Sequence, residues 1–517
     1  MLGAESLLRT LVANGVDICF MNPGTSEMQF VAALDRVPGM RGVLCLFEGV
    51  CSGAADGYAR MAGRPAATLL HLGPGLANGL SNFHNARKAR SPIVSIVGEH
   101  STQHLEHDAP LSADVEAFAR PVSDDIIYLR RAADMGIAAA KTIEAARRPP
   151  GQVSMLIVPA DYSWSEAGEP GPVIPGPCRA TPPAAGIEEA ARLIRSRKNV
   201  GIILSGTALH GRGLQAAGRL AAATGVRVFA NRNAGRMESG RGRFQPERVP
   251  YFPEAALATL AGLQHLLLVE SKAPVSFFGY PEQPSLMAPA DCKLHVVAGL
   301  EEDGTAVLET LVEMCGAQGS TAAARSAPAA TLPGPGPLTL PALAQAVGAL
   351  LPEHAIVSDE MVSSGEPVWN RLLCAAPHDH LPVAGGSIGQ GLPVAVGAAI
   401  ACPDRKVVAL EADGSGMYTL QSLWTMARES LDVTTVIFAN HRYRILDVEM
   451  RRTGANGFGP LADAMIGIGR PDIDWVKLSE GLGVPAVRAT TTEAFVTEFG
   501  RAVRERGPRL IEAALPA

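Results

Sequence analysis

Two oxygen-bearing side chains in the C-terminal third of the sequence stand where they could hold a divalent cation. Asp413 follows the apolar run 406–412, and Asn440 follows the apolar run 433–439, with a helix-like stretch between the runs. A strand–helix–strand unit of this kind brings the ends of both strands to one edge of a parallel sheet. Mg²⁺ prefers one or two such protein oxygens together with phosphate oxygens. The spacing therefore predicts a magnesium site.

The tripeptide Asp413-Gly414-Ser415 has two possible interpretations. On its own it is a common turn with a helix cap, and Asn440 would then be a loop residue. Between a strand and a helix, the backbone N–H groups of Gly414 and Ser415 could instead bind phosphate groups. The strand context favours a combined cation and diphosphate site.

Acidic, hydroxyl and imidazole side chains follow apolar runs near the N-terminus. A buried carboxyl at Glu48 would have a raised pKa and could share a proton with a ligand, although an acidic residue that opens a helix also complements the helix dipole. Thr25 and Ser26 follow another run, where Ser26 and Gln29 fit a helix-capping pair. His71 ends a third run, a place where a histidine is usually a hydrogen-bonded structural residue.

At these positions the sequence resembles the thiamin diphosphate-dependent enzymes, whose signature is Gly-Asp-Gly-Ser followed at this interval by Asn-Asn. Here the two halves read Ala412-Asp413-Gly414-Ser415 and Ala439-Asn440. The resemblance implies that Asp413, Asn440 and the backbone carbonyl of Arg442 hold Mg²⁺. Two alanines replace signature residues, but neither replacement removes a metal ligand.

The resemblance also implies a cofactor loop at residues 385–393. Ile388 would wedge the two cofactor rings into a bent shape, and the carbonyl of Gly386 would accept a hydrogen bond from the aminopyrimidine. Read locally, the segment is a glycine-rich turn that needs close backbone approach. Ser363 is a further candidate for the diphosphate, and Asn78 belongs to a Gly-Pro-Gly-x-x-Asn motif that acetolactate synthases share.

In the first part of the chain, Glu48 followed by Ala-Asp-Gly-Tyr-Ala-Arg (residues 55–60) matches the pyrimidine-binding domain of thiamin diphosphate-dependent 2-oxo acid decarboxylases and acetolactate synthases. The resemblance implies that Glu48 protonates the pyrimidine ring and that Thr25 and Ser26 lie beside the substrate carboxylate. His71 matches the position of a proton-transferring histidine of benzoylformate decarboxylase, a residue that acetolactate synthases lack. A second histidine of that enzyme falls near Gly279 and is absent.

The elements that must position these residues are short apolar runs interleaved with helix-like stretches, a pattern typical of parallel sheets covered on both faces. Two segments rich in Pro, Gly, Ala and Ser, at about 166–186 and 316–341, are expected to be linkers. They predict three doubly wound α/β domains at 1–166 (pyrimidine-binding), 187–316 (central) and 341–517 (diphosphate-binding).

In the central domain, four arginines gather in one predicted loop. They are Arg232, Arg236, Arg241 and Arg243. Such a cluster could face an anionic ligand or simply solvent. The glycines of the stretch 199–213 do not complete a dinucleotide motif, and no segment indicates FAD.

Composition excludes several classes of protein. The 517 residues carry a net charge of −6 with 47% hydrophobic residues and no long basic run, which argues against nucleic acid or an anionic membrane as partner. No apolar stretch reaches the ~20 residues of a membrane span, and no secretory signal is apparent. The eight cysteines are far apart, as in a reduced cytoplasmic enzyme.

The sequence thus predicts an enzyme that uses thiamin diphosphate and Mg²⁺ to decarboxylate a 2-oxo acid through an enamine. The order of motifs favours an acetolactate synthase-like carboligase, whereas His71 favours a benzoylformate decarboxylase-like enzyme that releases an aldehyde. A relative that binds the cofactor without turnover is a third possibility. In relatives, the first domain of one subunit faces the third domain of another, so a homodimer or a pair of dimers is expected.

Overall fold

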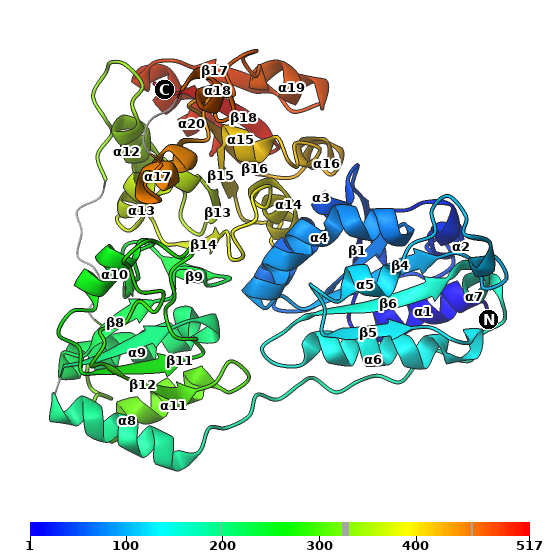
Figure 1. The fold of residues 1–517 in the computed structure, drawn as a ribbon, viewed down its shortest axis with the longest axis horizontal. Coiled ribbons are helices and arrows are strands. Elements are labelled where there is room, and N and C mark those ends of the chain that lie inside the picture. Colours follow the sequence, from blue (N-terminus) through cyan, green and yellow to red (C-terminus); the bar gives the residue numbers. More distant parts are fainter. Residues whose placement is uncertain (198, 323–329, 456–458, 517) are drawn as a thin grey trace.

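The computed structural model describes residues 1–197, 199–322, 330–455 and 459–516. Three sheets follow one another along the chain, each with helices on both faces (Figure 1). The predicted fold class of three doubly wound α/β domains is confirmed. Part of the predicted second linker, residues 323–329, lies outside the described residues. Within the described part of the chain, no helix combines the length and apolar character needed to cross a membrane.

The first domain contains a six-stranded parallel sheet in the order β2-β1-β3-β4-β6-β5. Its strands are β1 (Ile18–Asn22), β2 (Arg41–Leu44), β3 (Ala66–Leu70), β4 (Ile93–Glu99), β5 (Asp125–Tyr128) and β6 (Val153–Pro159). Its helices are α1 (Gly3–Ala13), α2 (Met28–Ala33), α3 (Glu48–Ala62), α4 (Leu72–Ala89), α5 (Val115–Ala119), α6 (Met135–Arg147) and α7 (Ala160–Trp164). The central strands are buried along their whole length because helices cover both faces.

The middle domain contains a five-stranded parallel sheet in the order β10-β8-β7-β11-β12. Its strands are β7 (Val200–Leu204), β8 (Arg227–Ala230), β10 (Glu247–Arg248), β11 (His265–Val269) and β12 (Lys293–Ala298). Its helices are α8 (Ala184–Ser196), α9 (Gly211–Thr224), α10 (Pro253–Thr259) and α11 (Gly304–Met314). Residues 165–183 connect it to the first domain without a helix or a strand (Figure 1).

The third domain contains a seven-stranded sheet in the order β17-β18-β16-β15-β13-β14-β9. Its strands are β9 (Met237–Ser239), β13 (Ile356–Glu360), β14 (His378–Pro382), β15 (Val407–Ala412), β16 (Val433–Ala439), β17 (Ala486–Ala489) and β18 (Arg509–Ala514). Its helices are α12 (Leu340–Leu350), α13 (Gly365–Leu372), α14 (Gly391–Ala401), α15 (Asp413–Gly416), α16 (Ser422–Arg428), α17 (Arg444–Arg452), α18 (Pro460–Ala464), α19 (Trp475–Gly481) and α20 (Thr492–Ala502).

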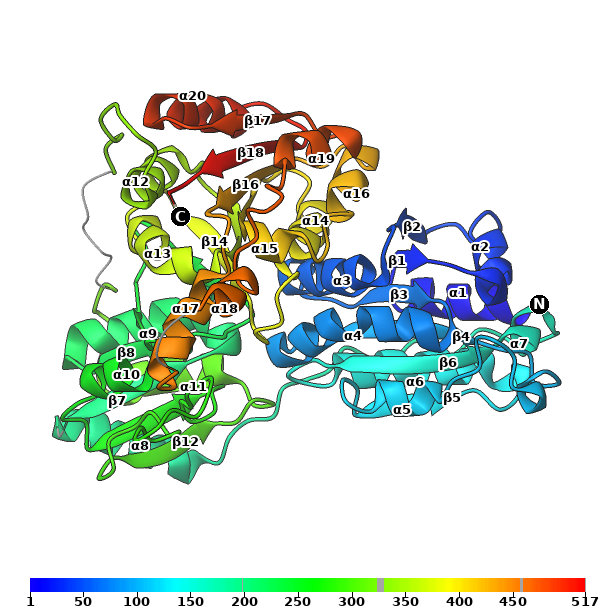
Figure 2. The same ribbon diagram turned by 45° about the horizontal axis from the view of Figure 1, so that its top comes forward.

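Two features bind the middle domain to the third. Strand β9 comes from the middle segment of the chain and pairs antiparallel with β14, so it covers what would otherwise be an open sheet edge. Helix α17 of the third domain lies against the middle domain (Figure 2), where Arg452 makes a two-pronged ion pair with Glu254 at 2.7 Å. The middle domain therefore holds the third domain at two places, at strand β14 and at helix α17.

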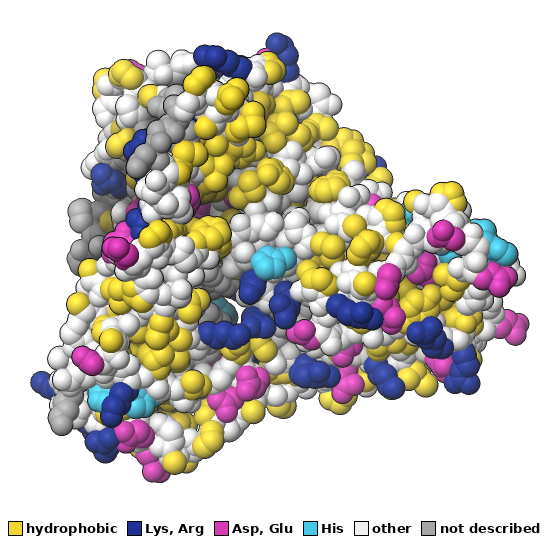
Figure 3. Space-filling view, viewed as in Figure 1, with side chains coloured by type: hydrophobic (Ala, Val, Ile, Leu, Met, Phe, Trp, Pro, Cys, Tyr) yellow, Lys and Arg dark blue, Asp and Glu magenta, His cyan; other side chains and the backbone are white. Residues whose placement is uncertain are grey.

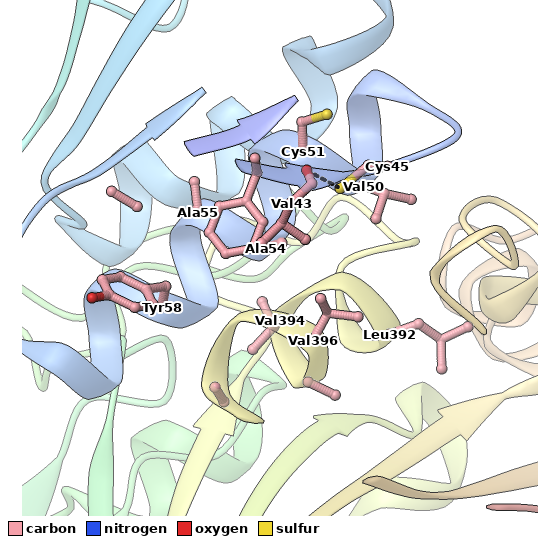
Figure 4. Close-up of a cluster of buried hydrophobic side chains, with 14 of the residues drawn as sticks. Val43, Cys45, Val50, Cys51, Ala54, Ala55, Tyr58, Leu392, Val394 and Val396 are labelled. Atoms are coloured by element: carbon pink, nitrogen blue, oxygen red, sulfur yellow. Dashed lines mark hydrogen bonds between the residues drawn. The ribbon is translucent and has the colours of Figure 1, made fainter. Parts of the chain in front are cut away.

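Helices α3 and α14 join the first domain to the third. One cluster of buried apolar side chains runs from β2 and α3 across to α14 without interruption (Figure 4). The helix backbones touch: a Cβ at Gly57 would lie 2.2 Å from the carbonyl oxygen of Val394, and a Cβ at Gly397 would lie 1.9 Å from that of Ala54. Only glycine permits so close a crossing.

The Asp-Gly-Tyr-Ala-Arg motif supplies a buried ion pair at this joint. Arg60 Nε donates to Asp56 Oδ1 at 2.8 Å, and both side chains are almost fully buried. The same guanidinium donates to the carbonyl oxygens of Pro382 in the third domain at 2.9 Å and Gly235 in the middle domain at 3.2 Å. Arg60 therefore bonds to all three domains at once.

We expect Gly397→Ala to destabilise the protein by about 1–3 kcal/mol, because the added methyl overlaps a backbone oxygen that cannot move aside. Gly186→Ala in α8 is the matched control, since a Cβ there meets nothing within 4 Å and the change raises helix propensity. Thermal unfolding should show a lower Tm for the first variant only. Equal Tm values for both variants would contradict the close crossing.

Candidate active site

The predicted residues of the first domain gather at the carboxyl ends of three adjacent strands. Thr25 follows β1, Glu48 is the first residue of α3 after β2, and His71 lies between β3 and α4. Because β2, β1 and β3 are neighbours in the sheet, their ends lie at one edge. The fold thus places these three candidates side by side although they are far apart in the sequence.

The carboxylate of Glu48 is held by its own domain. Its Oε2 accepts a hydrogen bond from Asn78 Nδ2 at 3.0 Å, and its Oε1 lies beside Gly75, where a Cβ would come within 3.3 Å. Glu48 is half-buried and Asn78 is exposed. The predicted cofactor residue Asn78 therefore contacts Glu48 directly and fixes the direction of the carboxylate.

His71 is paired with an acid that the sequence analysis did not single out. Its Nδ1 lies 2.8 Å from Oε2 of Glu27, and the same oxygen accepts from the N–H of Gly24 at 2.7 Å. Glu27 is buried, and burial raises the pKa of its carboxyl. The signal was present in the sequence: an acidic residue follows β1 in the same turn as Thr25.

Gly98 makes the burial of Glu27 possible. A Cβ at Gly98 would lie 1.6 Å from Oε1 of Glu27, and this oxygen has no hydrogen-bond partner among the described residues. A buried carboxylate oxygen without a partner is costly. Such a cost is typical of a functional site rather than of a surface turn.

The predicted capping pair of Ser26 and Gln29 is wrong. Helix α2 begins at Met28 without a side-chain cap, and the turn is closed by Glu27, whose side chain accepts from Gly24. Thr25 is exposed and Ser26 is half-buried. Ser26 therefore does not cap the helix, and it lies in the turn that follows β1.

Asp413 and Asn440 meet at the ends of the neighbouring strands β15 and β16. Asp413 Oδ1 accepts from the N–H of Gly414 at 2.8 Å, and Oδ2 accepts from the N–H of His441 at 2.6 Å. Asn440 Oδ1 accepts from the N–H of Arg442 at 3.0 Å. Both side chains are buried, and burial raises the pKa of Asp413.

These donors fit a magnesium ion. Carboxylate, amide and carbonyl oxygens are hard ligands, and Mg²⁺ needs only one or two from the protein when phosphate supplies others. The Arg442 side chain donates to Asp447 in two hydrogen bonds of 2.6 and 2.8 Å and pairs with Asp463. These contacts hold the segment that carries the Arg442 backbone carbonyl. The described residues contain no cluster of three or more His, Cys, Asp or Glu side chains that could hold a metal.

Gly414 and Ser415 fit a diphosphate. Both are buried in α15, and a Cβ at Gly414 would lie 2.3 Å from the ring of Tyr443. The absence of a side chain lets the start of α15 pack under this ring. The Gly414 N–H donates to Asp413 Oδ1, so a diphosphate bound here would take the place of that acceptor. Ser363 lies in the helical turn Val362–Ser364 that follows β13, the strand next to β15, and is half-buried.

The predicted cofactor loop follows β14. Gly386 has a φ of +80°, a conformation that favours glycine, and a Cβ there would lie 2.1 Å from the ring of Phe277 of the middle domain. Ile388 is half-buried. The loop is therefore a contact point between the middle and third domains as well as the expected seat of the cofactor.

Two buried glutamates lie beneath this loop and were missed in the sequence. Glu360 and Glu411 are paired in register on β13 and β15, and each is within hydrogen-bonding reach of the other. Burial raises the pKa of Glu360 to about 7, and burial together with Glu360 raises that of Glu411. Neither carboxyl oxygen of Glu411 has a hydrogen-bond partner among the described residues, and its side chain lies beside Glu360 on the neighbouring strand, so the two carboxyls are placed to share a proton.

A cavity of about 640 Å³ lies where the three domains meet. Its lining is rich in basic side chains, and Figure 3 shows Lys and Arg gathered at this junction. They include Arg60, Lys88, Arg90, Arg179, Arg232, Arg236 and Lys272.

Of the predicted arginine cluster, Arg236 pairs with Asp379 at 2.7 Å and Arg243 donates to the carbonyl of His378 at 2.7 Å. Glu48, His71 and Asp413 do not line this cavity.

Comparisons with known proteins cover the whole chain. Residues 1–118 match the N-terminal and residues 369–513 the C-terminal TPP binding domain of the thiamine pyrophosphate enzymes. A Mycobacterium tuberculosis protein named "Putative acetolactate synthase large subunit IlvX" is 49% identical, covering 100% of this chain and 99% of the relative. Benzoylformate decarboxylase of Pseudomonas aeruginosa is 29% identical, covering 96% of each chain.

A solved structure has the same arrangement of domains. The thiamine diphosphate-dependent 4-hydroxybenzoylformate decarboxylase of Rhodococcus jostii superposes with a TM-score of 0.86 at 25% identity, over 100% of this chain and 99% of that one. The likeness therefore extends through the middle domain, which neither matched TPP binding domain includes.

The contribution of Glu360 to the free energy of unfolding should fall as pH rises from about 4.5 to about 7, whereas buried His378, whose pKa burial lowers to about 4, contributes with the opposite sign. In the unfolded chain, Glu360 loses its proton near pH 4.5. In the folded protein, this carboxyl keeps its proton up to about pH 7, so the folded state binds more protons at Glu360 in this window. Each such proton contributes at most about 1.4 kcal/mol per pH unit. Denaturant unfolding at several pH values measures the slope of the free energy of unfolding against pH, and Glu360→Gln should make this slope more positive than in the wild type. An unchanged slope in the variant would contradict the shared proton.

Proposed function

This chain belongs to the thiamine pyrophosphate enzyme family, within the acetolactate synthase and decarboxylase branch, and from that membership we propose that it decarboxylates a 2-oxo acid with thiamin diphosphate and Mg²⁺. When bound, thiamin diphosphate supplies a thiazolium that accepts the electron pair left by the departing CO₂. The protein must hold the cofactor, keep a proton at its pyrimidine ring and deliver a proton to the product. The residues described above divide among these tasks.

Holding the cofactor falls to the third domain. Asp413, Asn440 and the carbonyl of Arg442 would hold Mg²⁺, and Gly414, Ser415 and Ser363 would bind the diphosphate. Gly386 and Ile388 would receive the pyrimidine end. The burial of Asp413 and the hard oxygen donors around it support this assignment.

Glu48 would hold the proton at the pyrimidine nitrogen. It lies at the strand ends of the first domain, is half-buried, and is directed by a side-chain amide, since Asn78 donates to its Oε2. A carboxyl in this setting can share a proton with a ring nitrogen without leaving its hydrogen bond. Thr25 and Ser26, in the adjacent turn, would bind the substrate carboxylate.

The hydrogen bond between Glu27 and His71 is the observation that carries the choice of product. Because Nδ1 is engaged by Glu27, Nε2 is the ring nitrogen left to deliver a proton, and the acid fixes the ring in that orientation. Proton delivery to the carbon that has lost CO₂ yields an aldehyde. We therefore favour non-oxidative decarboxylation with aldehyde release.

Carboligation is the second candidate. The 49% identical relative is named as an acetolactate synthase large subunit, and in that reaction the same carbon attacks a second 2-oxo acid. Both reactions share the loss of CO₂ and differ only in whether a proton or a carbonyl carbon is captured. Incubation with a panel of 2-oxo acids, with and without an acceptor, followed by mass analysis of the products separates them.

We propose a homodimer, or a pair of dimers, in which each active site is completed by the neighbouring subunit. Large apolar side chains are exposed beside both halves of the site: Leu46, two residues before Glu48, is 45% exposed, and Tyr418, five residues after Asp413, is 53% exposed. Apolar side chains exposed at functional loops are typical of a protein interface. Sedimentation or light scattering measures the assembly.

Glu48→Gln should lower kcat by a factor of about 10²–10⁴, because the amide cannot hold the proton at the pyrimidine ring. Binding of thiamin diphosphate should change little, since Gln keeps the length of the side chain. CO₂ release and a cofactor titration measure the two effects. A fully active Glu48→Gln enzyme would refute the assigned role, and a wild type without CO₂ release from any acid tested would favour a non-catalytic binding protein.

His71→Ala should shift the products from aldehyde to acyloin when an acceptor aldehyde is present, because protonation slows while CO₂ loss remains. Glu27→Gln should shift them in the same direction but less, because the imidazole stays and only its orientation weakens. Mass analysis of the product ratio tests both variants. A ratio unaltered in His71→Ala would show that another group delivers the proton.

A further inference from the structure

Within the cofactor loop 385–393, the backbone of residues 385–391 is held by side chains from the first domain of the same chain. His84 Nε2 lies 3.1 Å from the carbonyl oxygen of Gly385. Asn85 Nδ2 donates to the carbonyl of Ser387 at 2.8 Å, and Asn85 Oδ1 accepts from the N–H of Ser387 at 3.1 Å. Both donors come from α4, so one helix binds the loop on both sides of Gly386.

The other end of the loop is held as closely. The carbonyl of Gly389 accepts from Asn82 Nδ2 and from Thr419 Oγ1, each at 3.0 Å. Its N–H donates to Glu360 Oε1 at 2.8 Å. Ile388 is therefore flanked by two residues whose backbone groups are bound, Ser387 by Asn85 and Gly389 by Asn82.

Asn82 also contacts α3, the helix that begins at Glu48. The same Nδ2 donates to the carbonyl of Gly49 at 2.8 Å, next to Glu48, and Asn82 Oδ1 accepts from Asn85 Nδ2 at 3.0 Å. Asn82 and Asn85 are completely buried. A single amide thus connects the start of α3 with the loop that bears Ile388.

A glycine-rich loop has many conformations to lose, so fixing it in one shape is costly unless side chains hold it. The side-chain hydrogen bonds of the two asparagines go to the loop, to the start of α3 and to each other, and none of the bonds described goes to a strand of the first sheet. The bonds to Ser387 and Gly389 instead match the two places where the backbone must be set to present Ile388.

We propose that Asn82 and Asn85 are positioning residues for the cofactor: they hold loop 385–391 in the shape that receives the pyrimidine end of thiamin diphosphate, and Asn82 fixes that shape relative to the helix of Glu48. The inference rests on the proposed function. The first domain then has two roles, since Glu48 would act on the neighbouring subunit's cofactor while α4 holds the loop of its own chain.

The test is the Kd of thiamin diphosphate at saturating Mg²⁺, measured by titration calorimetry on the full chain. Asn82→Ala and Asn85→Ala should each raise the Kd by about tenfold or more, equivalent to about 1.4 kcal/mol. Asn14→Ala is the matched control, because Asn14 is also a buried asparagine of the first domain. Its side chain donates to the carbonyls of Thr10 at 2.9 Å and Pro172 at 3.2 Å, and neither of these residues belongs to the loop. All three variants should lower Tm.

His84→Ala is a second test of the same Kd if the variants of the buried asparagines fail to fold. His84 is half-buried and its ring contacts the loop at Gly385, so the variant should fold and still raise the Kd, though less than the asparagine variants. If all folded variants bind thiamin diphosphate as tightly as Asn14→Ala, the residues only stabilise the domain joint and the proposal is overturned. If the wild type does not bind thiamin diphosphate at all, the proposed function itself fails.

Discussion

The close crossing of α3 and α14 is the contact on which the rest of the molecule depends. Glycines let the two backbones touch, and the apolar cluster on either side continues from the first sheet into the third without a boundary. Because interiors are packed as densely as crystals, this contact has no slack. It fixes where the start of α3, and with it Glu48, lies relative to the start of α14 and the cofactor loop.

Polar groups at the same joint fix the relative orientation of the domains, which apolar packing alone does not specify. Arg60 is buried with Asp56 and donates to a carbonyl in each of the other two domains. A buried ion pair is weak evidence for stability, since desolvation offsets much of the attraction, but it is demanding about geometry. The Asp-Gly-Tyr-Ala-Arg motif thus marks a domain junction as well as a family.

The carboxyl groups of the site differ in how they are held, and this difference supports the tasks that we propose for them. Asp413 accepts two backbone N–H groups, whereas Glu48 is held by one side-chain amide and is partly open to solvent. Glu27 is buried with one oxygen unpartnered and the other on His71. A fixed acceptor suits a metal, a half-exposed acid suits proton sharing, and a buried acid suits the orientation of an imidazole.

The sequence by itself determined the fold class and supplied most of the residues of the site we propose, because parallel strands leave short apolar runs and place polar side chains directly after them, as at Glu48, His71, Asp413 and Asn440. It could not reveal Glu27 as the partner of His71, the Glu360–Glu411 pair, or the hold of Asn82 and Asn85 on the loop. These contacts join strands and helices distant along the chain. Only tertiary packing decides which side chains meet and which way an amide points, since register and close approach leave no local periodic pattern.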